Sequence, residues 1–477
     1  MEVTSLYFGI LAVISIFIYY LLSARYRILY LALLSCGFIA TFSYNLLFYI
    51  IIYSFINYYI GLKLQVPRFK KLLFRTGIFV NISQLIVLKY ASFTIDPVLS
   101  LFGFNLNVSA FSQFIVPVGI SFFTLQGIGY LMNIYFGWEK PEKNFTHFLL
   151  YIIFYPKFLS GPIERSNHFL PQLKIVQPFN EQKVSEGLRM ALFGFFKKVA
   201  IANQLAPFVN STYANLDSAG GTSLWVLLII QPLYIYFDFS GYTDIALGIA
   251  KTVGIELPPN FNRPFLSENV STFWKRFHIS LSSWFNDYVF RRTSFKYRTW
   301  GIYASVYAVV VTWILFGIWH GAGWNFMALG LLQAVAINYE YFTKKWRLSF
   351  FSKLPDYLRV WLGRFFTYLF YCGSLVFFFS PDIDSVFIYF SKLTELNESV
   401  SIDIRIEIFV LVLIFIIIFL LIETINSDFN NTYKKLEEYW LSNKIQFKLL
   451  RWFVYFLIIT VVIVFNNEVQ QFIYFKF

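Results

Sequence analysis

The chain has 477 residues, of which 58% are hydrophobic, 22% aromatic and only 14% charged, and its mean hydropathy is +0.60. A soluble globular protein carries about 25% charged residues, so this composition excludes a soluble fold and predicts an all-α polytopic membrane protein. The formal net charge is +13, and because the basic residues cluster between apolar stretches, membrane topology explains the surplus without a nucleic-acid partner.

Apolar stretches near the ~20-residue length that crosses a bilayer recur from one end of the chain to the other. They are Ser5–Leu22, Ile28–Tyr44, Leu46–Leu62, Thr76–Thr94, Gln113–Phe136, Leu188–Ala206, Ser223–Ala250, Ile302–Trp319, Gly323–Phe342, Leu358–Phe379, Glu407–Glu423 and Trp452–Phe465. We therefore expect about twelve spans in a single integral-membrane domain, residues 1–477, with no soluble domain. The first stretch lacks the features of a cleaved signal peptide, so a retained helix is expected.

The loops between these stretches orient the predicted spans. Basic residues occur throughout the part of the chain between Glu2 and Asp96, which contains no other carboxylate. The positive-inside rule therefore places the loop around Lys70 in the cytoplasm. The same rule places the loops around Lys275 and Lys345 there, and twelve spans then leave both termini outside.

One short apolar stretch, His147–Ser160, breaks this alternation because basic residues flank both of its ends. This pattern predicts a re-entrant or interfacial helix instead of a span. The following residues include Pro156, Gly161 and Pro162, and irregular backbone at membrane depth survives only inside protein or along a water-filled cavity. Two interpretations remain open, the lining of a cytoplasmic funnel and an ordinary surface hairpin.

Two acidic residues, Asp238 and Asp244, lie within the predicted span Ser223–Ala250. Acids at membrane depth are either structural hydrogen-bond hubs or parts of a site, and the sequence leaves both interpretations open. The next amphipathic stretch carries His278 between basic clusters. A histidine in such a setting is usually a solvated interfacial residue.

The run from Trp313 to Leu332 contains one ionisable side chain, His320. An imidazole at membrane depth is costly unless it pairs or faces a polar cavity, so His320 is a functional-site candidate, with a histidine that bridges two helices as the alternative. Glycines around it let another backbone or a ligand come close; they are Gly317, Gly321, Gly323 and Gly330. Trp319, Trp324 and Asn325 lie in the same run and are candidate tunnel residues.

Other catalytic and metal-binding classes receive no support from the sequence. Cys36 and Cys372 both lie in apolar runs, which indicates neither a disulfide framework nor a metal site. No G-x-x-x-x-G-K-[ST] loop supports an ATP-driven pump, and no G-x-S-x-G motif supports a serine triad. We therefore expect no metal and no bound cofactor.

Five motifs follow one another in the chain: VPVGISFFTLQGIGYLMNIY, SGPIERS, YFDFSGYTDIALGIAKTVGIELPPNFNRPF, FWKRFHISLSSWFNDYVF and GIWHGAGWN. In this order they resemble the membrane-bound O-acyltransferase family, in particular its bacterial alginate O-acetyltransferase branch, over a motif-bearing core at residues 115–345. The resemblance implies a helical bundle with a central tunnel, in which the family histidine maps onto His320 and a second polar position onto His278. Alginate-type members usually carry P-L-G-G-N where this chain reads RRTSFKYR, Arg291–Arg298, so alginate is not implied as the acceptor.

The resemblance also implies acetyl-CoA as the cytoplasmic donor, an exported or cell-surface polysaccharide as the acceptor, and an extracytoplasmic partner of the SGNH-hydrolase type. The expected location is the bacterial cytoplasmic (inner) membrane. In this chemistry His320 is the general base, His278 orients a substrate, and Asn325 is a candidate hydrogen-bond donor to the oxyanion. Two alternatives remain: a D-alanyl transferase for teichoic acids, and a glycan transporter in which Asp238, Asp244 and His320 serve as relay residues.

Overall fold

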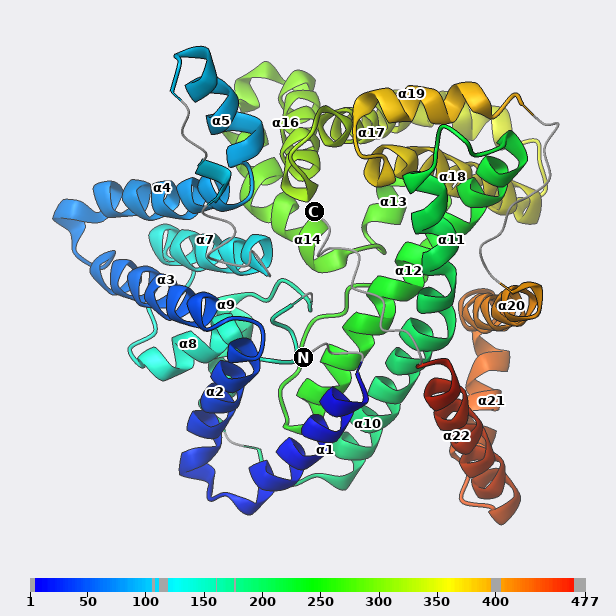
Figure 1. The fold of residues 1–477 in the computed structure, drawn as a ribbon, viewed down its shortest axis with the longest axis horizontal. Coiled ribbons are helices and arrows are strands. Elements are labelled where there is room, and N and C mark those ends of the chain that lie inside the picture. Colours follow the sequence, from blue (N-terminus) through cyan, green and yellow to red (C-terminus); the bar gives the residue numbers. More distant parts are fainter. Residues whose placement is uncertain are drawn as a thin grey trace.

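A computed structural model describes residues 5–104, 108–110, 119–159, 161–175, 177–395 and 405–466. Within these ranges the protein is built from helices (Figure 1), and its one β-type contact is an isolated bridge between Phe261 and Phe277. The predicted all-α class is therefore confirmed for the described residues.

The helices follow the predicted apolar stretches closely. The first part of the chain contains α1 (Leu6–Leu21), α2 (Ala24–Ala40), α3 (Tyr44–Lys63), α4 (Lys70–Leu88), α5 (Ala91–Leu101), α7 (Ile120–Phe136), α8 (Phe145–Ile153), α9 (Ser166–Leu173), α10 (Glu181–Phe196), α11 (Asn203–Ala214) and α12 (Gly221–Thr252). The second part contains α13 (Val270–Trp274), α14 (Ile279–Phe285), α15 (Arg291–Lys296), α16 (Ile302–His320), α17 (Trp324–Phe351), α18 (Asp356–Phe379), α19 (Ile383–Lys392), α20 (Ile406–Asp428), α21 (Asn430–Leu441) and α22 (Ile445–Phe465).

Seven helices of the described chain are long and apolar enough to cross a bilayer. They are α3, α4 together with the turn before it, α12, α16, α18, α20 and α22. By length and composition, these helices indicate a multi-pass membrane protein. The other predicted spans coincide with α1, α2, α7, α10 and α17, which are shorter or more polar, and residues 113–118 of one of them lie outside the described ranges. The count of about twelve spans stays a prediction.

Glycines bring α10 and α12 into direct backbone contact. A Cβ atom on Gly194 would lie 2.6 Å from the carbonyl oxygen of Gly241, and one on Gly248 would lie 2.4 Å from that of Gly187. On each helix the two glycines are seven residues apart, or about two turns, so they share one face. Small residues of this kind let helices approach closely in lipid, and α12 is held at the centre of the molecule (Figure 1).

The hairpin of α16 and α17 is packed in the same way. A Cβ atom on Gly317 would lie 2.2 Å from the carbonyl oxygen of Phe326, and one on Gly330 would lie 2.2 Å from that of Trp313. The prediction that glycines around His320 admit another backbone is confirmed for Gly317 and Gly330, whereas Gly321 and Gly323 lie against the side chains of Phe326 and Asn325. This close contact fixes the end of α16, where His320 lies.

The chain between α8 and α9 is irregular yet buried. Phe154, Tyr155 and Phe158 are all almost completely enclosed, and the backbone keeps isolated turn bonds, such as Phe154 N to Leu150 O at 2.9 Å and Lys157 N to Phe154 O at 3.0 Å. A side chain supplies a further partner where Tyr155 N donates to Ser35 Oγ at 3.1 Å. Burial of this kind disfavours the ordinary surface hairpin, whereas the re-entrant path through the membrane stays a prediction.

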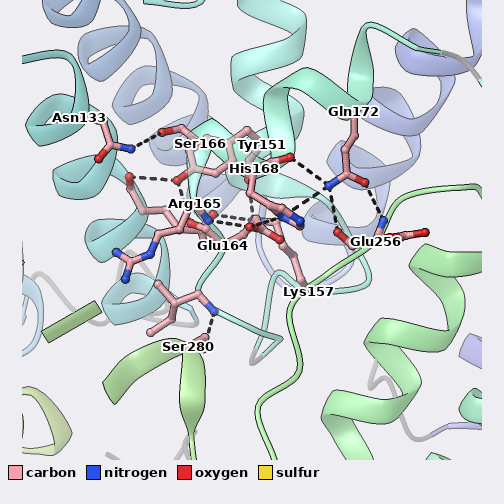
Figure 2. A network of polar contacts seen from close by, with 12 residues as sticks. Asn133, Tyr151, Lys157, Glu164, Arg165, Ser166, His168, Gln172, Glu256 and Ser280 are labelled. Carbon is pink, nitrogen blue, oxygen red and sulfur yellow. Dashed lines mark hydrogen bonds and ion pairs between the residues drawn. The ribbon is translucent and has the colours of Figure 1, made fainter. Parts of the chain in front are cut away.

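A buried lysine holds the same irregular segment in place (Figure 2). Lys157 Nζ donates to Gln126 Oε1 at 2.5 Å and to the carbonyl oxygen of Tyr151 at 2.6 Å. Burial lowers the pKa of Lys157 to about 7, because desolvation disfavours the charged amine. The lysine therefore joins α7, α8 and the segment that follows.

Candidate active site

Both predicted catalytic histidines line one pocket. Its walls come from α12, α16, α17, α18 and the turn around α13. The lining residues are Ile235, Trp274, Phe277, His278, Phe316, His320, Leu329, Gly330, Gln333, Tyr371, Ser374, Leu375 and Phe378. Most of this surface is apolar, and polar interactions are stronger in such a setting than in water. The structure thus brings together the two residues that the sequence placed on separate segments.

His320 occupies the last turn of α16 and is only 5% exposed. Aromatic rings enclose its imidazole: the ring centroids of Phe316, Trp319 and Phe378 lie 4.9, 5.0 and 5.4 Å away. These rings limit the imidazole to the pocket side and keep bulk water from it.

Two residues from the start of the loop after α4 bind the end of the His320 helix. Lys89 Nζ donates to the carbonyl oxygens of Trp319 at 2.9 Å and His320 at 3.1 Å, and Tyr90 OH donates to that of Ile318 at 2.9 Å. The last carbonyls of a helix have no partner within it, and a cation is favourable there. Sequence reasoning missed this cap, although Lys89 is a basic residue inside a predicted span.

His278 is 1% exposed, so the expectation of a solvated interfacial histidine was wrong. Its ring centroid lies 4.6 Å from that of Phe239 and 6.0 Å from that of Trp319. Burial, and secondarily the neighbouring His320, lowers the pKa of His278 well below its usual range. Burial therefore favours the neutral imidazole.

The backbone of His278 is in the left-handed region, with φ +49°. This conformation costs roughly 1–2 kcal/mol in a residue with a Cβ atom. The loop at Asn260 holds it there, because Ile279 N donates to Asn260 O at 2.9 Å and Ser280 N donates to Asn260 Oδ1 at 3.1 Å. Strain that surrounding structure maintains is typical of functional sites.

Further contacts fix the His278 loop from two sides. Ile163 N, in the irregular segment before α9, donates to Ser280 Oγ at 2.9 Å (Figure 2). On the other side, the Glu340 carboxylate of α17 accepts from Val270 N at 2.5 Å and from Ser271 N at 3.0 Å. Three of the sequence motifs therefore meet around one histidine.

The two candidate acids of α12 lie in ion pairs away from the pocket lining. Asp238 is completely buried and pairs with Lys198, which is also buried. Asp244 Oδ2 lies 2.7 Å from Lys197 Nζ, and this pair is partly exposed. Both lysines belong to a π-helix, Lys197–Ala202, that joins α10 to α11. Neither acid is among the described residues that line the pocket.

The three remaining candidates occupy different environments. Trp319 lies beside both histidines, and its Nε1 donates to Ser121 O at 3.4 Å. Trp324 is 62% exposed and packs against Phe93. Asn325 is buried, and its Nδ2 donates to Phe377 O at 3.0 Å and to Ser380 O at 2.8 Å.

Those two hydrogen bonds tie the start of α17 to the end of α18. Both N–H groups of the Asn325 side chain bind carbonyls at the end of α18, so neither points to an oxyanion. Of the candidates outside the histidine pair, Trp319 alone shares their surroundings. No local pattern could predict the Asn325 contact, because its partners lie more than fifty residues away.

Comparison with known proteins places the pocket inside a matched core. Residues 142–380 match the model of the membrane-bound O-acyltransferase family, and this range contains both histidines. The probable alginate O-acetylase AlgI of Azotobacter vinelandii is 31% identical over 325 residues, 66% of this chain and 63% of that protein. The peptidoglycan O-acetyltransferase of Helicobacter pylori is 30% identical over 380 residues, 72% of this chain and 68% of that protein.

A third relative is named for a different activity. The teichoic acid D-alanyltransferase of Bacillus subtilis is 31% identical over 247 residues, 49% of this chain and 61% of that protein. The chain spans about two thirds of the length of the curated relatives it matches.

Proposed function

This chain is a member of the membrane-bound O-acyltransferase family, and we propose that it moves an acetyl group from cytoplasmic acetyl-CoA to an exported or cell-surface polysaccharide. The observation that carries the proposal is the enclosed, largely apolar pocket lined by both His320 and His278. Relatives named as an alginate O-acetylase and a peptidoglycan O-acetyltransferase support the acetyl group and the glycan acceptor.

The proposed chemistry is a direct transfer between a thioester and a hydroxyl group. The acceptor oxygen attacks the thioester carbon while His320 takes the hydroxyl proton as general base. The new C–O bond forms, the C–S bond breaks, and the leaving thiolate recovers the proton from His320. An imidazole is the natural base near neutral pH, and the surrounding rings keep out water that would hydrolyse the thioester.

The other candidates have supporting roles in this proposal. His278, buried and held by its loop, orients the donor or the acceptor against His320. Trp319 forms the wall between the two imidazoles. Asp238 and Asp244 support α12 from outside the pocket, and Trp324 and Asn325 lie where the tunnel would open beyond the end of α16.

The proposal includes a membrane arrangement. About twelve spans and a re-entrant segment surround a central tunnel in the bacterial cytoplasmic membrane, with the loops around Lys70, Lys275 and Lys345 in the cytoplasm. The donor thus enters from the cytoplasmic side. An extracytoplasmic partner of the SGNH-hydrolase type receives the acyl group and passes it to the glycan.

Isotope incorporation into surface glycans tests this function. Cells with and without the gene are supplied with labelled acetate and, separately, with labelled D-alanine, and the label in purified glycan is measured. Gene-dependent incorporation of acetyl is the expected result. Gene-dependent incorporation of D-alanine would favour the alternative suggested by the teichoic acid relative, and gene-dependent export of glycan without either label would favour a transporter.

A further inference from the structure

The pocket contains a polar side chain that neither the mechanism nor the sequence motifs use. Gln333 lies on α17, lines the pocket with both histidines and is 1% exposed. Its Oε1 accepts a 3.0 Å hydrogen bond from Trp274 Nε1. Within the described chain its Nε2 has no hydrogen-bond partner.

Trp274 determines which way the Gln333 amide points. An indole N–H only donates, so it requires the carbonyl oxygen of the amide and not its NH₂ group. Turning the amide round would place two donors against each other. The NH₂ group is therefore held away from Trp274, as a fixed donor at the pocket surface.

The other polar groups around this end of the pocket are already engaged. Ser374 Oγ donates to the carbonyl oxygen of Tyr371 at 2.9 Å, and Trp274 Nε1 is used by Gln333 itself. Buried donors without a partner are rare in native proteins, and each calls for an explanation such as a ligand. A ligand with a carbonyl acceptor at this depth would supply the missing partner.

The position of Gln333 along the helices indicates which part of a substrate it meets. Gly330, one turn before Gln333, packs against Trp313, and Trp313 precedes His320 by seven residues on α16, a rise of about 10 Å. Gln333 lies one turn further along α17, and therefore about three turns from His320 along the helix axes, in the direction in which α17 runs toward the basic loop around Lys345. In the proposed topology this is the cytoplasmic side.

We propose that the Gln333 side chain donates a hydrogen bond to an amide carbonyl of the pantetheine arm of the acyl donor. The inference rests on the proposed function. With the thioester carbon beside His320, the rest of the donor extends toward the cytoplasm, and its arm carries amide carbonyls separated by short apolar segments. An apolar wall with one fixed N–H donor is complementary to such an arm. The arm is common to CoA and to acyl-carrier proteins, so the acetyl and the D-alanyl reactions would both use this contact.

Binding of unreactive donor analogues to the full-length protein in lipid nanodiscs tests the inference. One probe is a thioether analogue of acetyl-pantetheine; the second replaces the amides of the arm with methylene groups. The wild type should bind the first probe about 10- to 100-fold more tightly, the range expected when a buried donor loses its acceptor. Gln333→Leu should bind both probes alike, and Gln333→Glu, which retains an acceptor for Trp274, should do the same.

A second buried glutamine provides the matched control. Gln231 on α12 is completely enclosed, its Nε2 donates to Cys372 O at 2.9 Å, and its Oε1 accepts from Tyr213 OH at 2.6 Å. Its amide is thus satisfied by protein, and Gln231 is not among the described lining residues. Gln231→Leu should lower the folded yield yet keep the wild-type ratio of the two dissociation constants.

The outcomes distinguish a failure of the Gln333 inference from a failure of the proposed acetyl-transfer function. An equal ratio of dissociation constants in the wild type and Gln333→Glu overturns the inference, as does a wild type that binds neither probe. Acetyl transfer by the wild type is measured in parallel with acetyl-pantetheine. Transfer without a Gln333-dependent ratio rejects the inference alone, whereas a Gln333-dependent ratio without any acyl transfer rejects the proposed function alone.

Discussion

The histidine pair and the acid–lysine pairs are two buried polar groups of the same membrane protein, and they are built in opposite ways. His278 and His320 line a pocket and are enclosed by aromatic rings. Asp238, in contrast, faces Lys198 in a completely buried pair. One group is directed at a space that a substrate can fill, whereas the other is neutralised by the protein.

Whether a buried polar side chain is paired within the protein or lines a pocket distinguishes a structural residue from a functional one better than its amino-acid type does. A charge in a low-dielectric interior is tolerated when an opposite charge compensates it, and such a pair has little left to offer a substrate. A neutral imidazole at a pocket wall keeps its capacity to accept a proton. Removal of each group should therefore damage a different property of the protein.

The largest expected effect is on catalysis at His320. His320→Ala should lower acetyl transfer by about 10²- to 10⁴-fold, the usual contribution of a general base, while the folded yield stays normal because alanine is accommodated in a helix. His278→Ala should lose less than about 10²-fold if that ring only orients a substrate. The measurement is labelled acetyl in surface glycan at matched protein level.

His147→Ala is the control for this series, since His147 lies on α8 and is not among the described residues that line the pocket. It should retain wild-type incorporation. Near-normal acetyl transfer by His320→Ala would show that His320 is not the general base, and the glycan-transporter alternative would then have to be reconsidered.

At Asp238 the expected effect is on folding. Asp238→Asn leaves Lys198 as a buried charge without its counter-ion, which typically costs about 3–5 kcal/mol. Asp244→Asn, in the partly exposed pair with Lys197, should cost only about 0–1 kcal/mol. The comparison is made by thermal unfolding in detergent, together with acetyl transfer per folded molecule.

A double substitution sharpens this test. Asp238→Leu combined with Lys198→Met removes both charges and should recover much of the stability lost in Asp238→Asn, because well-packed apolar residues often replace buried ion pairs without loss. If Asp238→Asn folds as well as the wild type and yet transfers no acetyl, Asp238 belongs to the site and the contrast with the histidines fails.

The parts of this molecule that local sequence could predict are those that local physics determines. Helix positions followed from apolar length, and His320 stood out because a lone imidazole in an apolar run is costly. The lysine partners of the acids could not be predicted, since Lys198 lies 40 residues from Asp238 and no periodicity encodes that pairing. The adjacent Lys197 and Lys198 within the predicted span Leu188–Ala206 were the available signal.

For His278, the local sequence predicted the wrong environment. Its neighbours Lys275 and Arg276 indicated an interfacial position, but the left-handed turn and the contacts with Asn260 direct the imidazole inward. Only the family resemblance marked this residue. The orientation of the Gln333 amide could not be predicted from the sequence, because it depends on a hydrogen bond from Trp274, which lies on a different helix.

The smallest expected effect concerns the cap of the His320 helix, where a residue acts on the site without touching the pocket. Lys89→Met removes the cation bound to the carbonyl oxygens of Trp319 and His320, which should cost about 1–2 kcal/mol of stability. Because the last turn of α16 then loosens, acetyl transfer per folded molecule should fall about tenfold. Thermal unfolding and acetyl incorporation measure the two effects separately.

Two matched variants decide whether Lys89 positions His320 or only stabilises the fold. Lys89→Arg keeps a cationic donor for the same carbonyls and should recover most of the transfer rate. Lys70→Met removes a lysine from the other end of α4, where the charge faces the ring of Tyr135, and should leave transfer unchanged. If Lys89→Met loses stability but keeps the full rate per folded molecule, the cap is purely structural and His320 is positioned by its aromatic enclosure alone.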